Sequence, residues 1–347
     1  MTTIRPRRRA VAAFGALAAA TLVLGACTNS SDDSGSTGAS KSNTDNDKSG
    51  DTVTIGFSAP AADHGWMGAI TSSAKAQAEQ YDDVDLKVAE GTNEVGLQIS
   101  QVETFINDKV DAIVLLPFDG AAMTPVALKA MEAGIPVINV DREFDSPFAA
   151  RTTVLGDNYG MGVSAGTYVC EQAAGDEDKV VAEIAGIDSL PLTQERSKGF
   201  SDALKKCGLE VENRVAAEFT VESGERVASN LLQAAPKIDY LWNHDDDQGV
   251  GVLAAIKNAN RDEFVMIGGA GSANVMRDIK ADNTVLKATV IYPSTQAADG
   301  IKLARLIAQG KSMSDLAEVQ VPRKVQLAAP VVTKDNVDEY MDSAFES

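Results

Sequence analysis

The sequence is poor in the side chains that bind metals or that attract acidic partners. Its 347 residues include two histidines and three cysteines, too few for a metal-ligand cluster, so we expect no metal site. Lysine and arginine number 31 against 50 aspartates and glutamates, which gives a formal charge of −19. Such acidity argues against nucleic acid as a partner and against direct adsorption to anionic lipid. No general base and nucleophile converge in the sequence, so we expect neither an enzyme nor a cofactor.

Long apolar runs are also absent after the N-terminus. The one run, at 10–24, follows four arginines and ends in Leu24-Gly25-Ala26-Cys27. It is too short, and wrongly flanked, for a permanent membrane span, and it is typical of an export signal. Small residues before Cys27 indicate that residues 1–26 are removed and that Cys27 carries lipid. The alternative is an ordinary secretory signal with a cysteine near its cleavage site.

Residues 27–51 contain no large apolar side chain and cannot bury enough surface to offset their ordering entropy. We expect a disordered tether that holds the folded part at the outer face of the cytoplasmic membrane. Removal of the four signal arginines leaves 27 basic against 50 acidic residues, a charge of about −23. Cys170 and Cys207 then remain as a pair, which favours one disulfide in an oxidising compartment. Two separate buried thiols are the alternative.

From residue 52, short β-branched runs alternate with amphipathic stretches. The strands are predicted at 53–57, 86–88, 112–116, 135–140, 151–156, 179–185, 211–218, 239–242, 264–269 and 286–291. Helices are predicted at 66–80, 94–108, 120–133, 159–174, 193–207, 222–235, 247–259, 271–281 and 295–309. This alternation predicts an α/β fold with parallel sheets. Some 290 residues exceed one core, so two Rossmann-like lobes are expected.

Ligands of open α/β sheets bind beyond the carboxyl ends of strands, and unusual residues follow several predicted strands here. Trp66, beside His64, offers a face for a sugar ring and hydrogen bonds for hydroxyls, although a Trp packed on the core would give the same pattern. Asp141 and Arg142 combine a carboxylate acceptor with a fork of N–H donors, unless they form an ordinary surface ion pair. In the run 243–247 we assign Asp245 to the ligand and Asp246 to the cap of the next helix.

Two other motifs are discounted. The run 162–166 fits the G-x-S-x-G pattern of serine hydrolases, which requires the serine on a turn between strand and helix. Ser164 is instead expected inside a helix. The glycines at 268–271 lack the Lys-Ser/Thr of a phosphate loop and predict a turn or a close approach of backbone to a ligand.

These residues resemble the ribose-binding-protein group of periplasmic sugar-binding proteins, the type I two-lobed fold. The resemblance extends from residue 52 to about 335 and is carried by the segments 135–142, 156–158, 195–200 and 243–246. It implies a monomeric binding subunit of an ABC importer, with permease and ATPase partners and a small sugar as ligand. A pentose, hexose or sugar alcohol all remain open.

The ligand residues that the resemblance implies are His64, Trp66, Met67, Asp141, Arg142, Gln194, Phe219, Asp245, Ala270 and Tyr292. Five of them depart from the ribose proteins: Met67 replaces an aromatic, Gln194 an arginine, Asp245 an asparagine, Ala270 an aspartate and Tyr292 a glutamine. Because the changes at Gln194 and Ala270 remove a charged pair while Asp141 and Arg142 stay, the ligand is expected to arrange its hydroxyls differently from ribose.

The resemblance also implies a hinge of three crossings, expected near 155–157, 292–293 and 323–326. The N-terminal lobe would comprise 52–155 and 293–323, and the C-terminal lobe 156–292 and 324–347. Closure of the lobes on the sugar would then be read by the permease. The alternatives are a furanosyl autoinducer or nucleoside as ligand, and a chemoreceptor role without transport. A repressor of the same fold is disfavoured, because an export signal occupies the place of its DNA-binding helices.

Overall fold

The computed structural model describes residues 46–313 and 321–347. The predicted signal peptide, the lipidation site Cys27 and the tether up to residue 45 lie outside the described residues. No helix within the described ranges is long and apolar enough to span a membrane. The same ranges contain no group of three or more His, Cys, Asp or Glu side chains placed to hold a metal ion.

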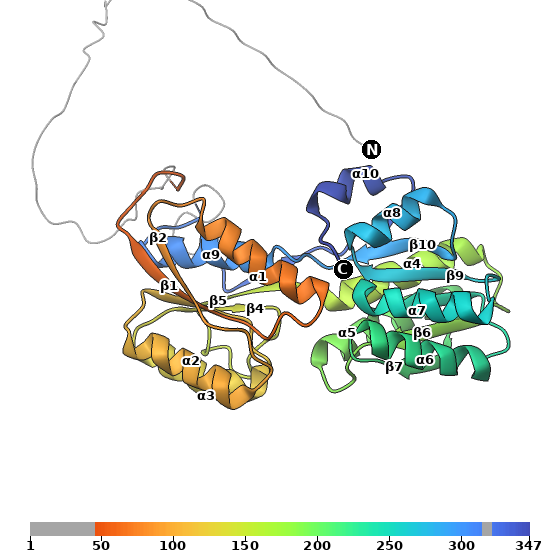
Figure 1. Cartoon of the computed structure of the whole chain (residues 1–347), viewed down its shortest axis with the longest axis horizontal. Coiled ribbons are helices and arrows are strands. Elements are labelled where there is room, and N and C mark those ends of the chain that lie inside the picture. The colour runs from red at the N-terminus through yellow and green to blue at the C-terminus, as the bar shows by residue number, and fades with distance from the viewer. Residues whose placement is uncertain (1–45, 314–320) are drawn as a thin grey trace, which may run out of the picture. The chain divides into compact units, whose positions relative to one another are not determined.

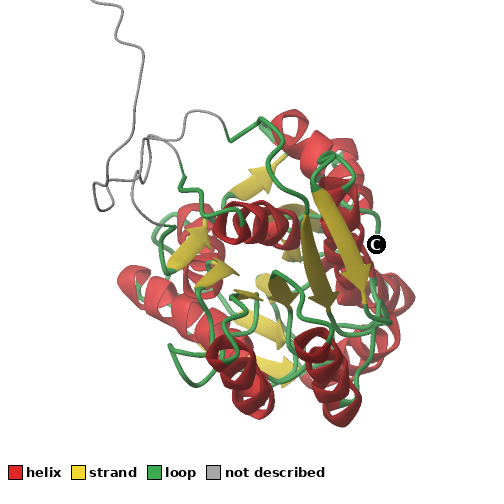
Figure 2. Ribbon diagram, turned by 90° about the vertical axis from the view of Figure 1, so that its left-hand side faces the viewer, coloured by secondary structure: helices red, strands yellow, loops and turns green. Residues whose placement is uncertain are grey.

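Two six-stranded sheets form the framework, each with helices on both faces (Figures 1 and 2). The first sheet has the order β11-β5-β4-β3-β1-β2 and is parallel throughout. Its strands are β1 (Val53–Ser58), β2 (Val84–Val88), β3 (Ala112–Leu115), β4 (Val137–Val140), β5 (Thr152–Gly156) and β11 (Lys324–Leu327). Its helices are α1 (Gly65–Ala78), α2 (Val95–Asn107), α3 (Gly120–Glu132) and α9 (Gln296–Ala308).

The second sheet has the order β12-β10-β9-β8-β6-β7, and only its edge strand β12 is antiparallel. Its strands are β6 (Val181–Ala185), β7 (Val211–Ala216), β8 (Tyr240–Asn243), β9 (Val265–Ala270), β10 (Leu286–Ile291) and β12 (Val331–Thr333). Its helices are α4 (Asn158–Ala173), α5 (Pro191–Leu204), α6 (Val221–Ala234), α7 (Asp246–Ala259), α8 (Ala273–Ala281) and α10 (Val337–Tyr340), with 3-10 turns η1 (Lys205–Cys207) and η3 (Met341–Ser343). The predicted architecture of two α/β lobes is therefore confirmed.

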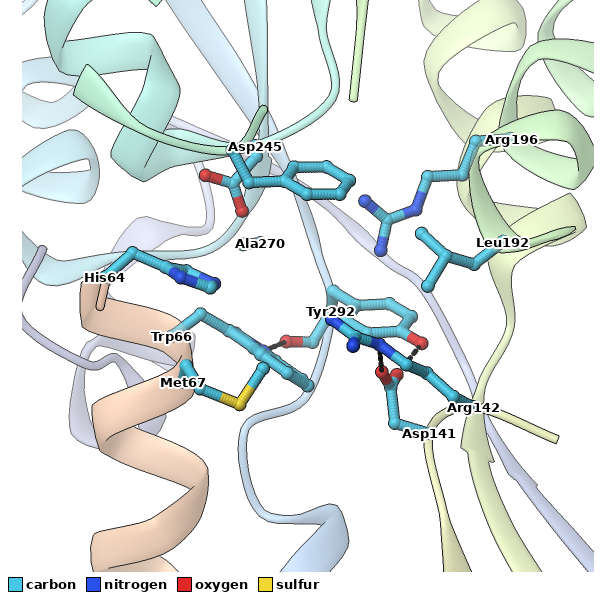
Figure 3. Close-up of a pocket in the computed structure, with 11 residues that line it drawn as sticks. His64, Trp66, Met67, Asp141, Arg142, Leu192, Arg196, Asp245, Ala270 and Tyr292 are labelled. Carbon is cyan, nitrogen blue, oxygen red and sulfur yellow. Dashed lines mark hydrogen bonds and ion pairs between the residues drawn. The ribbon is translucent and has the colours of Figure 1, made fainter. Parts of the chain in front are cut away.

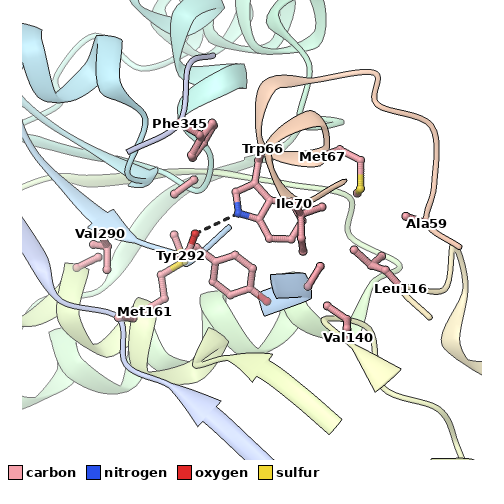
Figure 4. Packing of buried hydrophobic residues seen from close by; sticks show 14 of the residues in the cluster. Ala59, Trp66, Met67, Ile70, Leu116, Val140, Met161, Val290, Tyr292 and Phe345 are labelled. Carbon is pink, nitrogen blue, oxygen red and sulfur yellow. Dashed lines mark hydrogen bonds between the residues drawn. The ribbon is translucent and has the colours of Figure 1, made fainter. Parts of the chain in front are cut away.

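The core follows from the two-residue period of the strands. In β3, Ala112 and Val114 pack in the cluster of α1 and α9, while Ile113 and Leu115 pack in the cluster of α2 and α3. All four are fully buried, as in a strand covered on both faces. The cluster of α1 and α9 continues through Trp66, Tyr292 and Met161 to the face of the second sheet under α4 and α5 (Figure 4).

The third connection between the sheets differs from the prediction. It was expected near 323–326, with residues from 324 on in the second lobe. Residues 324–327 instead form β11, which pairs with β5 in the first sheet, and the chain reaches the second sheet only through 328–330. A strand's own sequence does not specify which sheet edge will accept its hydrogen bonds, so the boundary was placed too early.

The predicted tether also ends earlier than expected. The backbone oxygens of Asn46 and Lys48 accept hydrogen bonds from Arg305 at 2.7 and 2.9 Å, and the Gly50 N–H donates to Asp83 at 2.6 Å. Residues 46–50 are thus attached to the first lobe by long-range polar contacts, which composition alone does not reveal. In the second lobe, a disulfide joins Cys170 of α4 to Cys207 of η1, with a Cα–Cα distance of 5.8 Å.

Candidate functional site

One cavity lies at the carboxyl ends of the strands and is lined from both sheets and their helices (Figure 3). Both sheets reverse their strand order beside β1 and β6, and crevices at such reversals are the usual ligand sites of this architecture. The lining side chains are His64, Trp66, Met67, Asp141, Arg142, Leu192, Arg196, Phe219, Asp245, Ala270 and Tyr292. The structure therefore gathers nine of the ten predicted ligand residues around one space.

The tenth, Gln194, lies elsewhere and does not line this cavity. Its side chain is exposed, and its amide donates to the Asp188 carbonyl at 3.1 Å. Leu192 and Arg196 line the cavity instead, and the sequence reasoning missed both. Because α5 begins at Pro191, Leu192 and Arg196 are one turn apart on the same helix face, whereas Gln194 lies between them on another face. Because proline favours the first position of a helix, Pro191 could have shown that the helix begins there and which residues share a face.

Asp141 and Arg142 follow β4 and form the polar wall of the cavity. The Asp141 carboxylate lies 3.8 Å from Arg142 Nε and accepts a hydrogen bond from the Tyr292 hydroxyl. Arg142 donates through Nη1 to the Phe118 carbonyl at 2.7 Å, while its buried Nε has no hydrogen-bond partner. The guanidinium is thus fixed in place with its Nε–H among the donors that remain unused, an arrangement suited to receiving a ligand oxygen.

Arg196 supplies a second guanidinium, directed into the cavity from α5 (Figure 3). It is 4% exposed and donates to Asn158 Oδ1 at 2.9 Å and to the His244 carbonyl at 3.2 Å. Its charge also lies over the Tyr292 ring, 4.5 Å from the centroid. A buried cation held by neutral groups leaves its positive field available to ligand hydroxyls or other oxygens.

Aromatic and apolar groups provide the rest of the lining. Trp66, 6% exposed, donates its indole N–H to the Tyr292 carbonyl at 3.1 Å, so its ring rather than its N–H remains for a ligand. His64 Nδ1 lies 2.6 Å from Asp63. Burial acts to raise the pKa of Asp63, but the hydrogen bonds from His64 and Asn93, together with the charge of His64 and a backbone hydrogen bond, lower it overall. Phe219 lines the cavity from the loop after β7. Ring faces of this kind suit the C–H face of a sugar.

Asp245 combines the two roles that the sequence analysis divided between Asp245 and Asp246, and the prediction that Asp246 caps the helix is wrong. Asp245 caps α7 by accepting the Gln248 N–H at 3.1 Å, and it also lines the cavity. Asp246 accepts the N–H groups of Gly269, Gly271 and Ser272, each at 2.8 Å. It therefore occupies three amides of the glycine-rich turn after β9, which are unavailable to a phosphate. Burial, and next the negative charge of Asp247, raise the pKa of Asp245 to about 7.

Three cavity residues hold unusual backbone conformations. Asp141, Phe219 and Ala270 have φ values of 65°, 61° and 99°. This region is tolerated by Asp but costs energy for Phe and Ala, and such strain is concentrated at functional sites. The strain supports a binding role for the cavity.

Ser164 lies inside α4, as predicted, and its hydroxyl donates to the Ala329 carbonyl at 2.9 Å. It is therefore not on the turn between strand and helix that the nucleophile of a serine hydrolase requires.

Comparisons with known proteins agree with this geometry. Residues 55–312 match the family model described as periplasmic binding protein domain. The chain is 28% identical over 260 residues to the D-ribose/D-allose-binding protein of Pseudomonas aeruginosa, covering 73% of this chain and 80% of that protein. It is 30% identical to the ribose import binding protein of Bacillus subtilis, over 62% of this chain and 70% of that protein.

Solved structures share the fold. An ABC transporter solute binding protein from Mycobacterium smegmatis with bound glycerol superposes with a TM-score of 0.75 at 25% identity, covering 85% of this chain and 99% of that one. Since the family model spans nearly three quarters of the sequence and the sheets have the expected form, the chain belongs to the periplasmic binding protein domain family and is a ribose-binding-protein-like, extracytoplasmic sugar-binding protein.

Proposed function

We propose that the chain is the solute-binding subunit of an ABC importer, which captures a small sugar or sugar alcohol between its lobes and delivers it to a membrane permease. The observation that carries this proposal is a cavity lined from both lobes, which combines ring faces with a carboxylate–guanidinium pair. Export with lipid attached to Cys27 and action as a monomer belong to the same proposal. The relatives named for ribose, allose and ribose import support it.

Each wall of the cavity has a defined task in this proposal. Asp141 and Asp245 accept from ligand hydroxyls, while Arg142 and Arg196 donate to hydroxyl or ring oxygens. Trp66 and Phe219 pack against the C–H groups of the ligand and exclude water. Since each lobe contributes one carboxylate and one guanidinium, the full set exists only when the lobes are closed. A ligand shifts the open–closed equilibrium through contacts that only the closed state provides.

The ligand class is tested by a thermal-shift screen of the mature chain, produced from Thr28 on, against triols, tetritols, pentoses, hexoses, nucleosides and amino acids. A ligand that binds only the folded state raises Tm by mass action. We expect a shift with sugars or polyols. A response to nucleosides or amino acids, with none to sugars or polyols, would contradict the proposed ligand class.

In this proposal, closure is also stabilised by a direct hydrogen bond between the two lobes that does not involve the ligand. Helix α1 begins at Gly65 without a side-chain cap and without an acidic residue in its first turn. Asp247, at the start of α7 in the other lobe, accepts the Trp66 N–H at 2.9 Å and is 3% exposed. A carboxylate from the second lobe thus caps a helix of the first, where the helix dipole favours negative charge.

We therefore expect Asp247→Ala to weaken ligand binding about 10- to 100-fold, since a hydrogen bond to a charged group contributes about 1.5–3 kcal/mol. The loss should appear as faster dissociation, measured by stopped-flow fluorescence, because the open state is favoured. Asp247→Asn keeps an acceptor oxygen, so its dissociation rate should lie between that of the wild-type protein and that of Asp247→Ala. Asp262→Ala, which removes an exposed carboxylate of the same lobe, is the control. An unchanged dissociation rate in Asp247→Ala would exclude Asp247 from closure.

A further inference from the structure

A second cavity adjoins the first on the side of Asp141 and Arg142. These two residues and Leu192 line both cavities, and Figure 3 shows all three on the side of the first cavity opposite His64. The second cavity continues between the start of α3 in the first lobe and the start of α5 in the second. A ligand group held by Asp141 and Arg142 is therefore in reach of both spaces.

The two spaces differ greatly in size. The first cavity is ≈ 30 Å³ and the second ≈ 440 Å³. About 30 Å³ is the share of one water molecule in the liquid, whereas a cavity of about 150 Å³ holds a benzene ring. By the same measure a hexose, with twice the non-hydrogen atoms of benzene, requires about 300 Å³. A ligand that contacts Asp141 and Arg142 thus finds its free volume in the second cavity, and that volume exceeds what one sugar unit fills.

Negative charge predominates in the lining of the second cavity, which contains five carboxylates and two cations. Lys324 Nζ lies 3.0 Å from both carboxylate oxygens of Glu143, and Arg142 is paired with Asp141. Both cations are thus already held by carboxylates of the same lining, which leaves three carboxylates in excess. A phosphate or carboxylate on the ligand would be repelled here, whereas a neutral group or an amine would not.

The second lobe adds apolar surface to the same cavity. Leu190, Leu192 and the ring of Tyr159 lie in its lining. The Tyr159 hydroxyl donates to Asp202 at 3.1 Å, so the ring is held in place although it is 41% exposed. An exposed aromatic ring beside leucine side chains offers contact to an apolar or ring-shaped group, as in other small-molecule sites.

We propose that the second cavity is a subsite for a group linked to the bound sugar, so that the preferred ligand is a glycoside with a neutral or cationic substituent rather than a free sugar. This inference rests on the proposed function and extends its ligand class. Asp141 and Arg142 contact the sugar at the junction of the two cavities. Leu192 and Tyr159 pack against the substituent, and the excess carboxylates exclude anionic groups.

The test is calorimetric titration of the mature chain with D-ribose, D-glucose and D-galactose, with their methyl and phenyl glycosides in both anomeric forms, and with their 1-phosphates. The wild-type protein should bind at least one phenyl glycoside roughly ten-fold or more tighter than the parent sugar, because the substituent buries apolar surface. No 1-phosphate should bind more tightly than its parent sugar.

Two tryptophan variants locate the substituent. Ala121 is exposed, lies at the start of α3 and lines the second cavity but not the first. Ala121→Trp should therefore remove the gain from the phenyl group and leave the affinity for the parent sugar unchanged. Ala122→Trp is the matched control, since Ala122 is the next residue of the same helix, is also exposed and lines neither cavity. It should keep the gain.

The outcomes separate this inference from the proposed function. Equal affinity of the wild-type protein for free sugars and their phenyl glycosides would overturn the subsite and leave a sugar-binding protein. An equal loss of both in Ala121→Trp would also overturn it, because the second cavity would then hold the sugar itself. A gain retained in Ala121→Trp would place the substituent elsewhere, and tighter binding of a 1-phosphate would contradict the exclusion of anions. Binding of neither sugars nor glycosides by the wild-type protein would overturn the proposed function.

Discussion

Replacement of Asp141 by Asn is expected to weaken ligand binding by about 100-fold or more. The carboxylate is 5% exposed, and the side chain that replaces it presents one acceptor and one donor in place of two acceptors. Loss of a hydrogen bond to a charged group costs about 1.5–3 kcal/mol, and the Arg142 guanidinium would also lose its ionic partner. Asp141→Ala, a larger truncation, should abolish binding. Isothermal titration calorimetry, with the ligand that raises Tm most in the thermal-shift screen, measures the affinity of both variants.

Asn is the more informative of the two variants because of the backbone. Asp141 has φ = 65°, a conformation that Asn tolerates and Ala tolerates poorly. The circular dichroism spectrum of Asp141→Asn should therefore match that of the wild-type protein. Asp82→Asn, an exposed carboxylate of the same lobe, removes the same charge and should leave affinity unchanged. Retained affinity in Asp141→Asn would place the ligand elsewhere.

The largest expected loss of stability follows Arg305→Met. Arg305 and Asp83 form two hydrogen bonds of 2.7 Å, and their side chains are 2% and 3% exposed. Removal of one partner of a buried pair leaves an uncompensated charge and costs about 3–5 kcal/mol. The same guanidinium holds residues 46–48, so that segment should also lose protection from hydrogen exchange. Chemical denaturation measures the free energy of unfolding.

Two further variants separate the contribution of the Arg305–Asp83 pair from that of an ordinary surface charge. Lys302→Met removes an exposed cation from the same helix, α9, and should change the free energy of unfolding by less than about 0.5 kcal/mol. Asp83→Asn combined with Arg305→Met removes both charges and should recover part of the loss. A loss below about 1 kcal/mol in Arg305→Met would show that the pair contributes little beyond its packing.

The pair also predicts a pH dependence. Hydrogen bonding to Arg305 holds the pKa of Asp83 well below its ordinary value of 3.8. In the acid range the unfolded chain therefore binds a proton that the folded chain does not, and the stability of the wild-type protein rises with pH there. The contribution of the pair is present above about pH 4 and is lost as the pH falls below it. The difference in stability between wild type and the double variant should shrink over that same acid window.

Much of the fold could be predicted from the sequence, because local patterns reflect local physics. The near-continuous apolar run at 112–116 predicted a strand buried on both faces, and β3 is one. Likewise, the loops after predicted strands contained Trp66, Asp141 and Asp245, which meet at one cavity since parallel strands place their carboxyl ends together. The sequence alone therefore determined the fold class and the neighbourhood of the site.

The tertiary structure alone decided how individual side chains are partnered. Tyr292 and Asp141 are separated by 151 residues, and Trp66 and Asp247 by 181, so no local pattern relates them. The choice of Arg196 over Gln194 depended on the phase of α5, and the sheet joined by β11 depended on which edge was open. Periodicity reports which face of an element is buried. The partner on that face is set by packing across the whole chain, and only the folded structure contains it.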